Sequence, residues 1–382
     1  MKRHIKAPRP NWQSIVEEQG LVYHTDEQGV PYWNESAYYS FSQDEVAVLE
    51  RAAQTWHEML LLAGDHIIEN NLYARLGIPE HMIPMIEDSW QAEPPSLYGR
   101  FDVVYDGINP PKLLEYNADT PTSLLEAGVI QWKWKEACFP RQDQFNSLYD
   151  RLIAKWEDVA PLLRQPLYLV YDDNVAEDRM NVAMMAETAM EANIDCVMMH
   201  IGDVGYNEAE REFRDLEENP MNTIFKLYPW EWIAHEEFGK HVPHSYFKGT
   251  VWIEPAWKML WSNKGILPLL YELFPNSPYL LPAYASEQEA KRHGAYVKKP
   301  ILSREGANVA VYINGTLAES ASGDYGDEGY IYQQYAPLPV YDGQRAVVGL
   351  WMVDGVPAGM GIRETAGLIT GNTSKFTPHI IY

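Results

Sequence analysis

Residues 114–120, LEYNADT, bring acidic and amide side chains to the end of a predicted strand, and they decide how the rest of the chain is interpreted. Glu115 and Asn117 are two residues apart, so they point to the same face of that strand. Asp102, in the stretch RFD at residues 100–102, has the same spacing and is expected on the neighbouring strand. Two carboxylates and an amide oxygen form the hard oxygen site that Mg²⁺ prefers. The alternative is three exposed or mutually paired polar residues.

Lysine and arginine side chains that suit phosphate follow later in the chain. Lys299 ends a predicted strand, and the loop at residues 301–308, ILSREGAN, contains Arg304 and Gly306. A loop of small residues can fold its backbone amides over phosphates, and an arginine adds a charge-assisted donor. Because side chains alternate along a strand, only one of Lys298 and Lys299 can meet a nucleotide, and Lys299 is favoured. The alternative is an exposed lysine pair on a hairpin.

Two C-terminal stretches complete the candidate nucleotide site. Residues 330–335, YIYQQY, alternate apolar and polar side chains, so this strand could offer backbone groups and Gln333 or Gln334 to an adenine edge. An ordinary strand explains the pattern equally well. Arg363, on a strand before the loop with residues 372–374, NTS, could neutralise a transferring γ-phosphate or pair with a neighbouring acid.

Composition narrows the class of protein and partner. The chain of 382 residues has a net charge of −24, which repels nucleic acid and anionic membranes. Its two cysteines, Cys138 and Cys196, match neither a metal-binding motif nor a disulfide framework. No signal peptide is recognised, and prolines interrupt the most apolar stretch, residues 265–285, so we expect a soluble cytoplasmic protein. The sequence contains no Walker loop, nucleophile elbow, dinucleotide fingerprint or His-x-x-x-His pattern.

Periodicity predicts a mixed α+β chain. A capping box at residues 42–45, SQDE, opens a long helix whose apolar face recurs until a stop near residues 77–79, GIP. In the middle of the chain, strands at residues 167–171 and 194–200 flank a helix at residues 176–192, which predicts a parallel βαβ unit. The C-terminal region is rich in antiparallel strands joined by Asn-Gly and Asp-Gly turns.

At these stretches the chain resembles the synthetase domain of the glutathionylspermidine synthase family, and especially its stand-alone bacterial members called acid–amine ligases. The matching segments, which keep the family's order, are 100–102, 114–123, 228–232, Lys264, 299–300, 330–339 and 361–370. The resemblance spans nearly the whole chain. It implies one ATP-grasp catalytic region over residues 1–382, in which antiparallel sheet lobes clamp ATP beside a small parallel α/β unit. Approximate sub-lobes at 1–160, 161–260 and 261–382 would hold the metal-site segment, the α/β unit, and the ATP-binding and lid segments.

The resemblance also implies a reaction and residue roles. A substrate carboxylate would attack the γ-phosphate of ATP, and an amine would attack the acyl phosphate to give an amide, ADP and phosphate. Such phosphoryl transfer needs positioning and charge neutralisation more than a covalent nucleophile. The implied ligands are Asp102, Glu115 and Asn117 for Mg²⁺; Lys264, Lys299 and the Gly306 loop for ATP phosphates; Gln333 and Gln334 for adenine; and Arg100 and Arg363 for the acyl phosphate or the acid. The loop after Lys299 is expected to act as a lid that becomes ordered when ATP binds.

The chain departs from the family at two points. The bifunctional members carry an N-terminal amidase domain with a catalytic cysteine, for which this chain has no room, so we expect no hydrolysis of glutathionylspermidine. The loop at residues 302–306, LSREG, lacks the glycine expected before Arg304 and adds an acid, Glu305, after it. Glu177 and Asp178 could attract a polyamine, although acids are also common at the start of a helix.

These expectations combine into one leading function. We expect an ATP- and Mg²⁺-dependent acid–amine ligase with ATPase activity, acting on a small peptide-like acid such as glutathione and on an amine such as a polyamine. The same fold could instead bind or hydrolyse nucleotide without ligation. The 13 Trp and 25 Tyr residues leave a carbohydrate-binding protein as a third alternative, and such a protein would bind no ATP.

Overall fold

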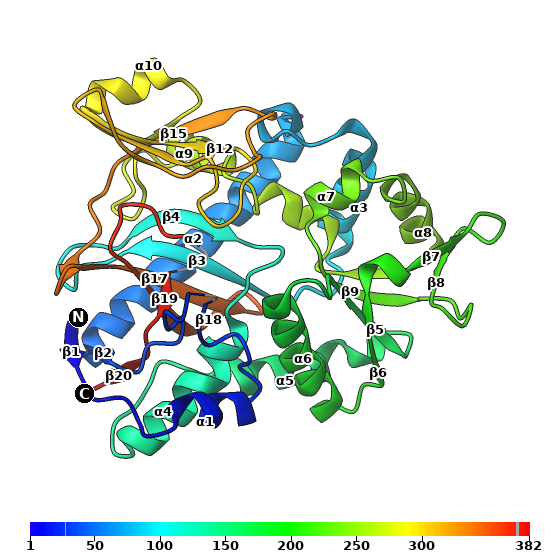
Figure 1. Ribbon diagram of the computed structural model, residues 1–382. Helices are drawn as coiled ribbons and strands as arrows, with labels where there is room; N and C mark the ends of the chain where they lie inside the picture. Colours follow the sequence, from blue (N-terminus) through cyan, green and yellow to red (C-terminus); the bar gives the residue numbers. More distant parts are fainter. Residues whose placement is uncertain (27, 372–373) are drawn as a thin grey trace.

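The computed structural model describes residues 1–26, 28–371 and 374–382, and it has the expected α+β architecture (Figure 1). Of the predicted loop stretch at residues 372–374, Asn372 and Thr373 lie outside the described residues. Two larger antiparallel sheets lie one above the other in Figure 1, and a parallel sheet with its helices lies beside them.

A six-stranded antiparallel sheet carries the predicted metal-site segment. Its order is β19-β18-β17-β3-β4, with β16 paired to β17. The strands are β3 (Tyr98–Val104), β4 (Lys112–Asn117), β16 (Val340–Tyr341), β17 (Gln344–Val353), β18 (Val356–Thr365) and β19 (Lys375–Phe376). The Asp-Gly turns at 342–343 and 354–355 have positive φ at both residues, as tight hairpins require. The sheet therefore joins strands from the predicted first and third sub-lobes.

Helix α2 (Gln43–Glu69) packs against β17 and β18 of this sheet and begins with the predicted capping box. Its buried face includes Trp56, whose ring lies 5.5 Å from that of Phe101. The prediction of a helix that continues to about residue 77 is wrong. Asn71 takes a left-handed φ of 53°, and a separate 3₁₀ turn follows.

The second antiparallel sheet faces the first across the cavity described below. Its order is β11-β15-β12-β13-β14. The strands are β11 (Ala283–Tyr284), β12 (Ala295–Pro300), β13 (Ala310–Ile313), β14 (Thr316–Ser320) and β15 (Tyr330–Gln334). The predicted Asn314-Gly315 turn joins β13 to β14. Helices α9 (Ile266–Leu273) and α10 (Glu287–Ala290) pack against this sheet (Figure 1).

The predicted βαβ unit is present and belongs to a larger parallel sheet of order β10-β9-β5-β6. The strands are β5 (Leu167–Tyr171), β6 (Cys196–His200), β9 (Thr223–Leu227) and β10 (Val251–Ile253). Helix α6 (Ala176–Glu191) connects β5 to β6, and α5 (Leu148–Val159) packs against α6. The strand order reverses between β5 and β9, and ligands of open parallel sheets bind outside the carboxyl ends of strands at such a point.

Smaller elements complete the fold. A three-stranded sheet of β1 (Lys2–Ile5), β2 (Ala37–Phe41) and β20 (His379–Ile381) brings the two termini together (Figure 1). The strands β7 (Gly205–Asn207) and β8 (Glu212–Arg214) pair with each other. The remaining α-helices of the described ranges are α1 (Trp12–Glu18), α3 (Ile83–Ala92), α4 (Gln131–Cys138), α7 (Trp230–His235) and α8 (Val242–Lys248). Within those ranges, no helix combines the length and the apolar character needed to cross a bilayer.

Candidate active site

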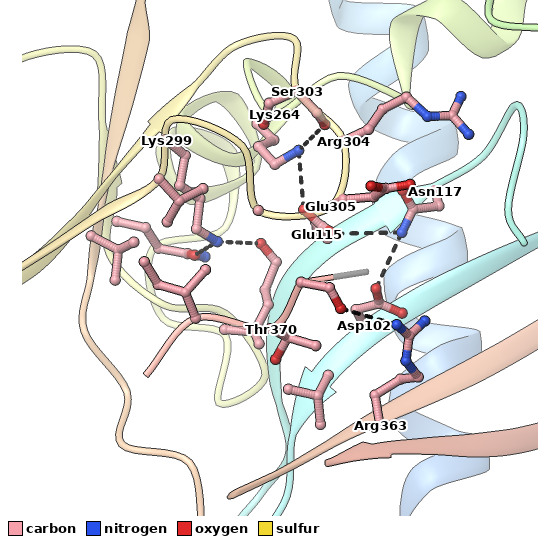
Figure 2. Close-up of a pocket in the computed structure, with 18 of the residues that line it drawn as sticks. Asp102, Glu115, Asn117, Lys264, Lys299, Ser303, Arg304, Glu305, Arg363 and Thr370 are labelled. Carbon is pink, nitrogen blue, oxygen red and sulfur yellow. Dashed lines mark hydrogen bonds and ion pairs between the residues drawn. The ribbon is translucent and has the colours of Figure 1, made fainter. Parts of the chain in front are cut away.

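The candidate site is a cavity between the two antiparallel sheets (Figure 2). Its empty volume of about 1510 Å³ includes space that is open to solvent. Every residue that the sequence predicts for the site lines this cavity, namely Arg100, Asp102, Glu115, Asn117, Lys264, Lys299, Gly306, Gln333, Gln334 and Arg363. The structure thus brings the predicted residues together, while their individual roles stay predictions.

Strands β3 and β4 position the candidate magnesium ligands. Asp102 lies directly opposite Glu115 in the antiparallel register, and Arg100 lies opposite Asn117, so the four side chains share one face. Asn117 donates from Nδ2 to Asp102 Oδ2 at 3.2 Å and to Glu115 Oε1 at 3.5 Å. Figure 2 shows these three side chains converging on the cavity.

The donor set of Asp102, Glu115 and Asn117 fits a hard divalent cation. The Asn117 amide nitrogen bridges the two carboxylates, and rotation of that amide would turn its oxygen toward a cation between them. Two carboxylate oxygens and one amide oxygen suit Mg²⁺, which completes its octahedron with water and phosphate oxygens. Among the described residues, no group of three or more His, Cys, Asp or Glu side chains could hold a metal ion.

Two lysines face this acidic pair. Lys264 Nζ lies 3.1 Å from Glu115 Oε2 and donates to the Ser303 carbonyl at 2.8 Å. Lys299 Nζ donates to Gln333 Oε1 at 2.7 Å. Both ammonium groups are therefore held at the cavity wall by acceptors that a phosphate oxygen could replace.

Burial and neighbouring charges together set the pKa of Glu115 and of Lys299. Burial alone would raise the pKa of Glu115, but the neighbouring Lys264 and Lys299, together with Arg100, lower it to about 2. Burial lowers the pKa of Lys299 to about 8, although Glu115 opposes that shift. At neutral pH the cavity therefore presents a carboxylate for a metal and a mainly cationic lysine for phosphate.

Alternation along β12 and β15 separates the candidate nucleotide ligands. Lys299 lies in the cavity, whereas Lys298 points to the other face, where its Nζ lies 3.8 Å from the centre of the Tyr330 ring. Gln333 is buried and holds Lys299. Gln334 also lines the cavity, but alternation directs its side chain to the opposite face of β15, so its backbone is the group it can offer to a base.

The two predicted arginines have different partners. Arg100 binds both oxygens of Asp102, at 2.7 and 3.0 Å, so it holds a candidate metal ligand in place. Burial lowers the pKa of Arg100, but the charge of Asp102 more than offsets this and raises the pKa above its ordinary value. Arg363 donates to the Ser123 hydroxyl at 3.3 Å and to the Gly371 carbonyl at 3.0 Å. An anion in the cavity can compete with such neutral partners.

The predicted lid loop lies against the cavity. Gly306 has a φ of 73°, and a Cβ there would lie 2.8 Å from the Thr370 carbonyl oxygen, so this contact requires glycine. Arg304 donates from Nη1 to Thr120 Oγ1 at 2.9 Å. The unexpected Glu305 lines the cavity, and burial raises the pKa of its carboxyl.

One buried ion pair at the cavity was not predicted as part of the site. Asp119 lies 2.5 Å from Lys226 Nζ and accepts the backbone N–H of Trp230 at 2.9 Å. Burial, and then the charge of Asp119, raise the pKa of the neighbouring Glu231, which also lines the cavity. Asp119 belongs to the LEYNADT stretch, but Lys226 is 107 positions away, so no local spacing could connect them.

Comparison with known proteins places this site in a family. A family model described as "Glutathionylspermidine synthase preATP-grasp" matches residues 3–382. A Haemophilus influenzae protein named "Putative acid--amine ligase" is 39% identical over 394 residues, which cover 99% of each chain. A trypanothione synthetase of Crithidia fasciculata is 28% identical over 84% of this chain and 53% of its own length. The bifunctional glutathionylspermidine synthetase/amidase of Escherichia coli is 26% identical over 97% of this chain and 62% of its own length.

These matches confirm the resemblance that the motifs indicated, and they cover the segments that build the cavity. The chain spans little more than half the length of the trypanothione synthetase, so the match concerns one part of that larger protein. The chain belongs to the glutathionylspermidine synthase preATP-grasp family and is an ATP-dependent ligase that forms carbon–nitrogen bonds.

Proposed function

We propose that this protein is a Mg²⁺-dependent acid–amine ligase that activates a small carboxylic acid as an acyl phosphate. The observation that carries the proposal is the meeting of Asp102 and Glu115 with Lys264 and Lys299 in one cavity between two antiparallel sheets. Hard oxygen ligands beside cationic donors suit a metal–nucleotide complex. The cations and ligands supply the positioning and charge that phosphoryl transfer requires.

In the first step, a carboxylate oxygen of the acid bonds to the γ-phosphorus while the bond from that phosphorus to the bridging oxygen of ADP breaks. Asp102, Glu115 and Asn117 would hold Mg²⁺, which when bound offsets the charge of the ATP phosphates. Lys264 and Lys299 would exchange their present acceptors for phosphate oxygens. Arg363 would stabilise the charge of the acyl phosphate, because its guanidinium faces the same cavity.

In the second step, the neutral amine nitrogen bonds to the acyl carbon while the bond from that carbon to the phosphate oxygen breaks, and the proton lost by the nitrogen leaves with the phosphate as hydrogen phosphate. Glu305 and Arg304 line the cavity, and the acids Glu177 and Asp178, which are not part of its lining, lie close enough to Glu305 to interact with it electrostatically. Burial, with a contribution from Glu177, raises the pKa of Asp178 to about 7. An amine that carries additional cationic groups would favour the ionised forms of these acids, so a polyamine is the first candidate.

Phosphate release from Mg-ATP tests the proposal. The purified protein is incubated with Mg-ATP alone and with glutathione or other small peptides plus spermidine, and the mixture is searched by mass spectrometry. We expect amine-dependent phosphate release and a product whose mass is acid plus amine minus water. Phosphate release without such a product would identify an ATPase, and the absence of both release and ATP binding would overturn the proposal.

The matched control for this assay is Glu115→Gln. Glutamine keeps the size of the side chain but removes the carboxylate that faces Lys264. Both phosphate release and product should disappear in this variant while the fold is kept. Activity that persists in Glu115→Gln would point to a contaminating enzyme or to a different metal site.

A further inference from the structure

A buried glutamate lies behind Arg363 with one of its oxygens unpaired. Glu126 begins the π-helical turn Glu126–Ile130, and such turns are frequent at functional sites. Its Oε1 accepts a hydrogen bond from the Tyr32 hydroxyl at 2.7 Å. Its Oε2 is buried and has no hydrogen-bond partner among the described residues. An ionised carboxylate is energetically unfavourable when it is buried without a full set of hydrogen bonds, so a functional reason for this glutamate is expected.

A chain of hydroxyl groups connects Glu126 to the cavity-lining arginine. The Tyr32 hydroxyl lies 3.1 Å from Ser123 Oγ, and Arg363 Nη1 donates to the same Ser123 oxygen at 3.3 Å. The Arg363 guanidinium also lies 5.5 Å from the centre of the Tyr32 ring. With Tyr32 donating to Glu126, hydrogen bonds run in one direction from the cation to the carboxyl.

Ser123 has an unusual backbone that serves this chain. Its φ of 67° lies in the left-handed region, which is unfavourable for a serine. The residue is buried, and its hydroxyl contacts both Tyr32 and Arg363. The strained residue Ser123 therefore carries the hydroxyl that connects Tyr32 with Arg363, although these two residues lie far apart in the sequence.

Three groups set the charge of Glu126. Burial, and then the negative charge of Glu177, raise the pKa of Glu126 to about 7, while the Tyr32 hydroxyl and the charge of Arg363 act in the opposite direction. Glu126 is thus poised between its neutral and ionised forms near neutral pH. Arg363 is the cation that favours the ionised form.

We propose that Glu126 is a positioning residue for Arg363 and that its ionised fraction takes up a proton from solvent when a phosphate or acyl-phosphate oxygen binds Arg363. This inference rests on the proposed function. A bound anion offsets the charge of Arg363, so the Glu126 carboxylate loses its counter-charge and becomes neutral. In the reverse direction, a neutral Glu126 leaves the full charge of Arg363 to the anion, because linkage is reciprocal.

Calorimetry of a non-hydrolysable ATP analogue tests this coupling. Adenosine 5′-(β,γ-imido)triphosphate with Mg²⁺ is titrated at pH 7 in two buffers that differ in ionisation enthalpy, which gives the number of protons taken up. We expect the wild-type protein to take up more protons than Glu126→Gln, by roughly a few tenths of a proton. Across pH 6 to 8, analogue affinity should fall more in the wild type than in Glu126→Gln, by up to about tenfold.

Two further variants control for structural effects. Tyr32→Phe keeps the ring beneath Arg363 but removes the hydroxyl that favours the ionised carboxyl, so Glu126 should hold more of its proton before binding and the proton uptake should be smaller than in the wild type. Lys298→Ala, on the face of β12 away from the cavity, should keep the wild-type proton count. Because burial also raises the pKa of Glu305 and lowers that of Lys299 to about 8, the proton uptake of each variant is compared with that of the wild type.

The possible failures are distinguishable. Absence of analogue binding in the wild type would overturn the proposed function and this coupling with it. Binding with equal proton uptake in the wild type and in Glu126→Gln would overturn the coupling alone. If Glu126→Gln does not fold, Tyr32→Phe decides, since unchanged proton uptake in that variant also contradicts the proposal.

Discussion

Two glutamates near this cavity, the half-buried Glu115 and the buried Glu126, differ in how readily they ionise. Glu115, on β4, faces Lys264 and Lys299, and its pKa is lowered to about 2. Glu126, at the start of a π-helical turn, is near Glu177, and burial and that neighbour raise its pKa to about 7. Burial acts in the same direction on both side chains, so the charged neighbours decide the outcome.

The difference separates two regions with two kinds of chemistry. Glu115 itself stays ionised at every pH at which the enzyme is expected to work, which suits a metal ligand. The region around Glu126 can change its charge when an anion binds Arg363. Both properties are useful in a phosphoryl-transfer site. A fixed charge helps to bind the substrate phosphates in the ground state, and an adjustable charge can respond when negative charge is redistributed during the reaction.

The largest expected effect comes from Glu115→Gln. Loss of the carboxylate removes a candidate metal ligand and leaves Lys264 without its ion-pair partner. We expect Mg²⁺-dependent ATP turnover to fall by about 10³-fold, at the upper end of the losses seen when one stabilising group is removed. The control is Glu58→Gln on the exposed face of α2, which should keep wild-type turnover. Undiminished turnover in Glu115→Gln would remove this residue from the metal site.

Arg363→Ala should lower turnover by about 10²-fold and ATP affinity much less, because its charge matters most as the phosphate transfers. Single-turnover rates and direct binding of the ATP analogue measure the two effects separately. Arg363→Lys keeps the charge but loses the planar fork, so an intermediate rate is expected. Equal losses of binding and turnover in Arg363→Ala would assign the residue to ground-state binding.

The features of this site that depend on residues close together in the sequence could be predicted. The two-residue spacing of Glu115 and Asn117 predicted a shared face, and the equal spacing around Asp102 predicted the neighbouring strand. Alternation along β12 separated Lys299 from Lys298. These predictions were correct because strand geometry and turn conformation depend on a few adjacent residues.

The contacts between residues far apart in the sequence could not be predicted. Glu126 and Tyr32 are 94 positions apart, and no spacing rule connects them. The same holds for Asp119 and Lys226, which meet only when the parallel sheet docks beside β4. The end of α2 was also missed, because Asn71, in the left-handed region, ends the helix well before the stretch at residues 77–79 that was expected to end it. Tertiary packing decides each of these outcomes.

A smaller effect on catalysis is expected from Lys299→Met, with Lys298→Met as its matched control. Lys299 lies in the cavity, so its loss should raise the KM for ATP by about tenfold, which corresponds to one charge-assisted hydrogen bond. Lys298→Met should leave KM unchanged. In the wild type, ATP affinity should weaken as pH rises through about 8, because burial lowers the pKa of Lys299 to that value and the neutral amine binds phosphate poorly. Equal KM values for the two variants would contradict the assignment of the cavity face.

The smallest expected effect on turnover belongs to Glu126→Gln, which instead changes how stability depends on pH. The folded pKa of about 7 lies above the ordinary value of 4.5, so the folded state holds this proton more tightly than the unfolded chain. The stability that this preference contributes is fully present below about pH 4.5 and is lost as pH rises to about 7.

Glu126→Gln is neutral throughout, so between pH 5 and 7.5 its unfolding midpoint should rise relative to the wild type, equivalent to about 1 to 3 kcal/mol. Glu115→Gln should show no such gain, because Glu115 is already ionised across this range. Thermal unfolding at the two pH values measures both variants. If the unfolding midpoints of Glu126→Gln and the wild type change with pH in parallel, Glu126 does not gain or lose a proton in this range. The contrast between the fixed charge of Glu115 and the adjustable charge of Glu126 would then be wrong.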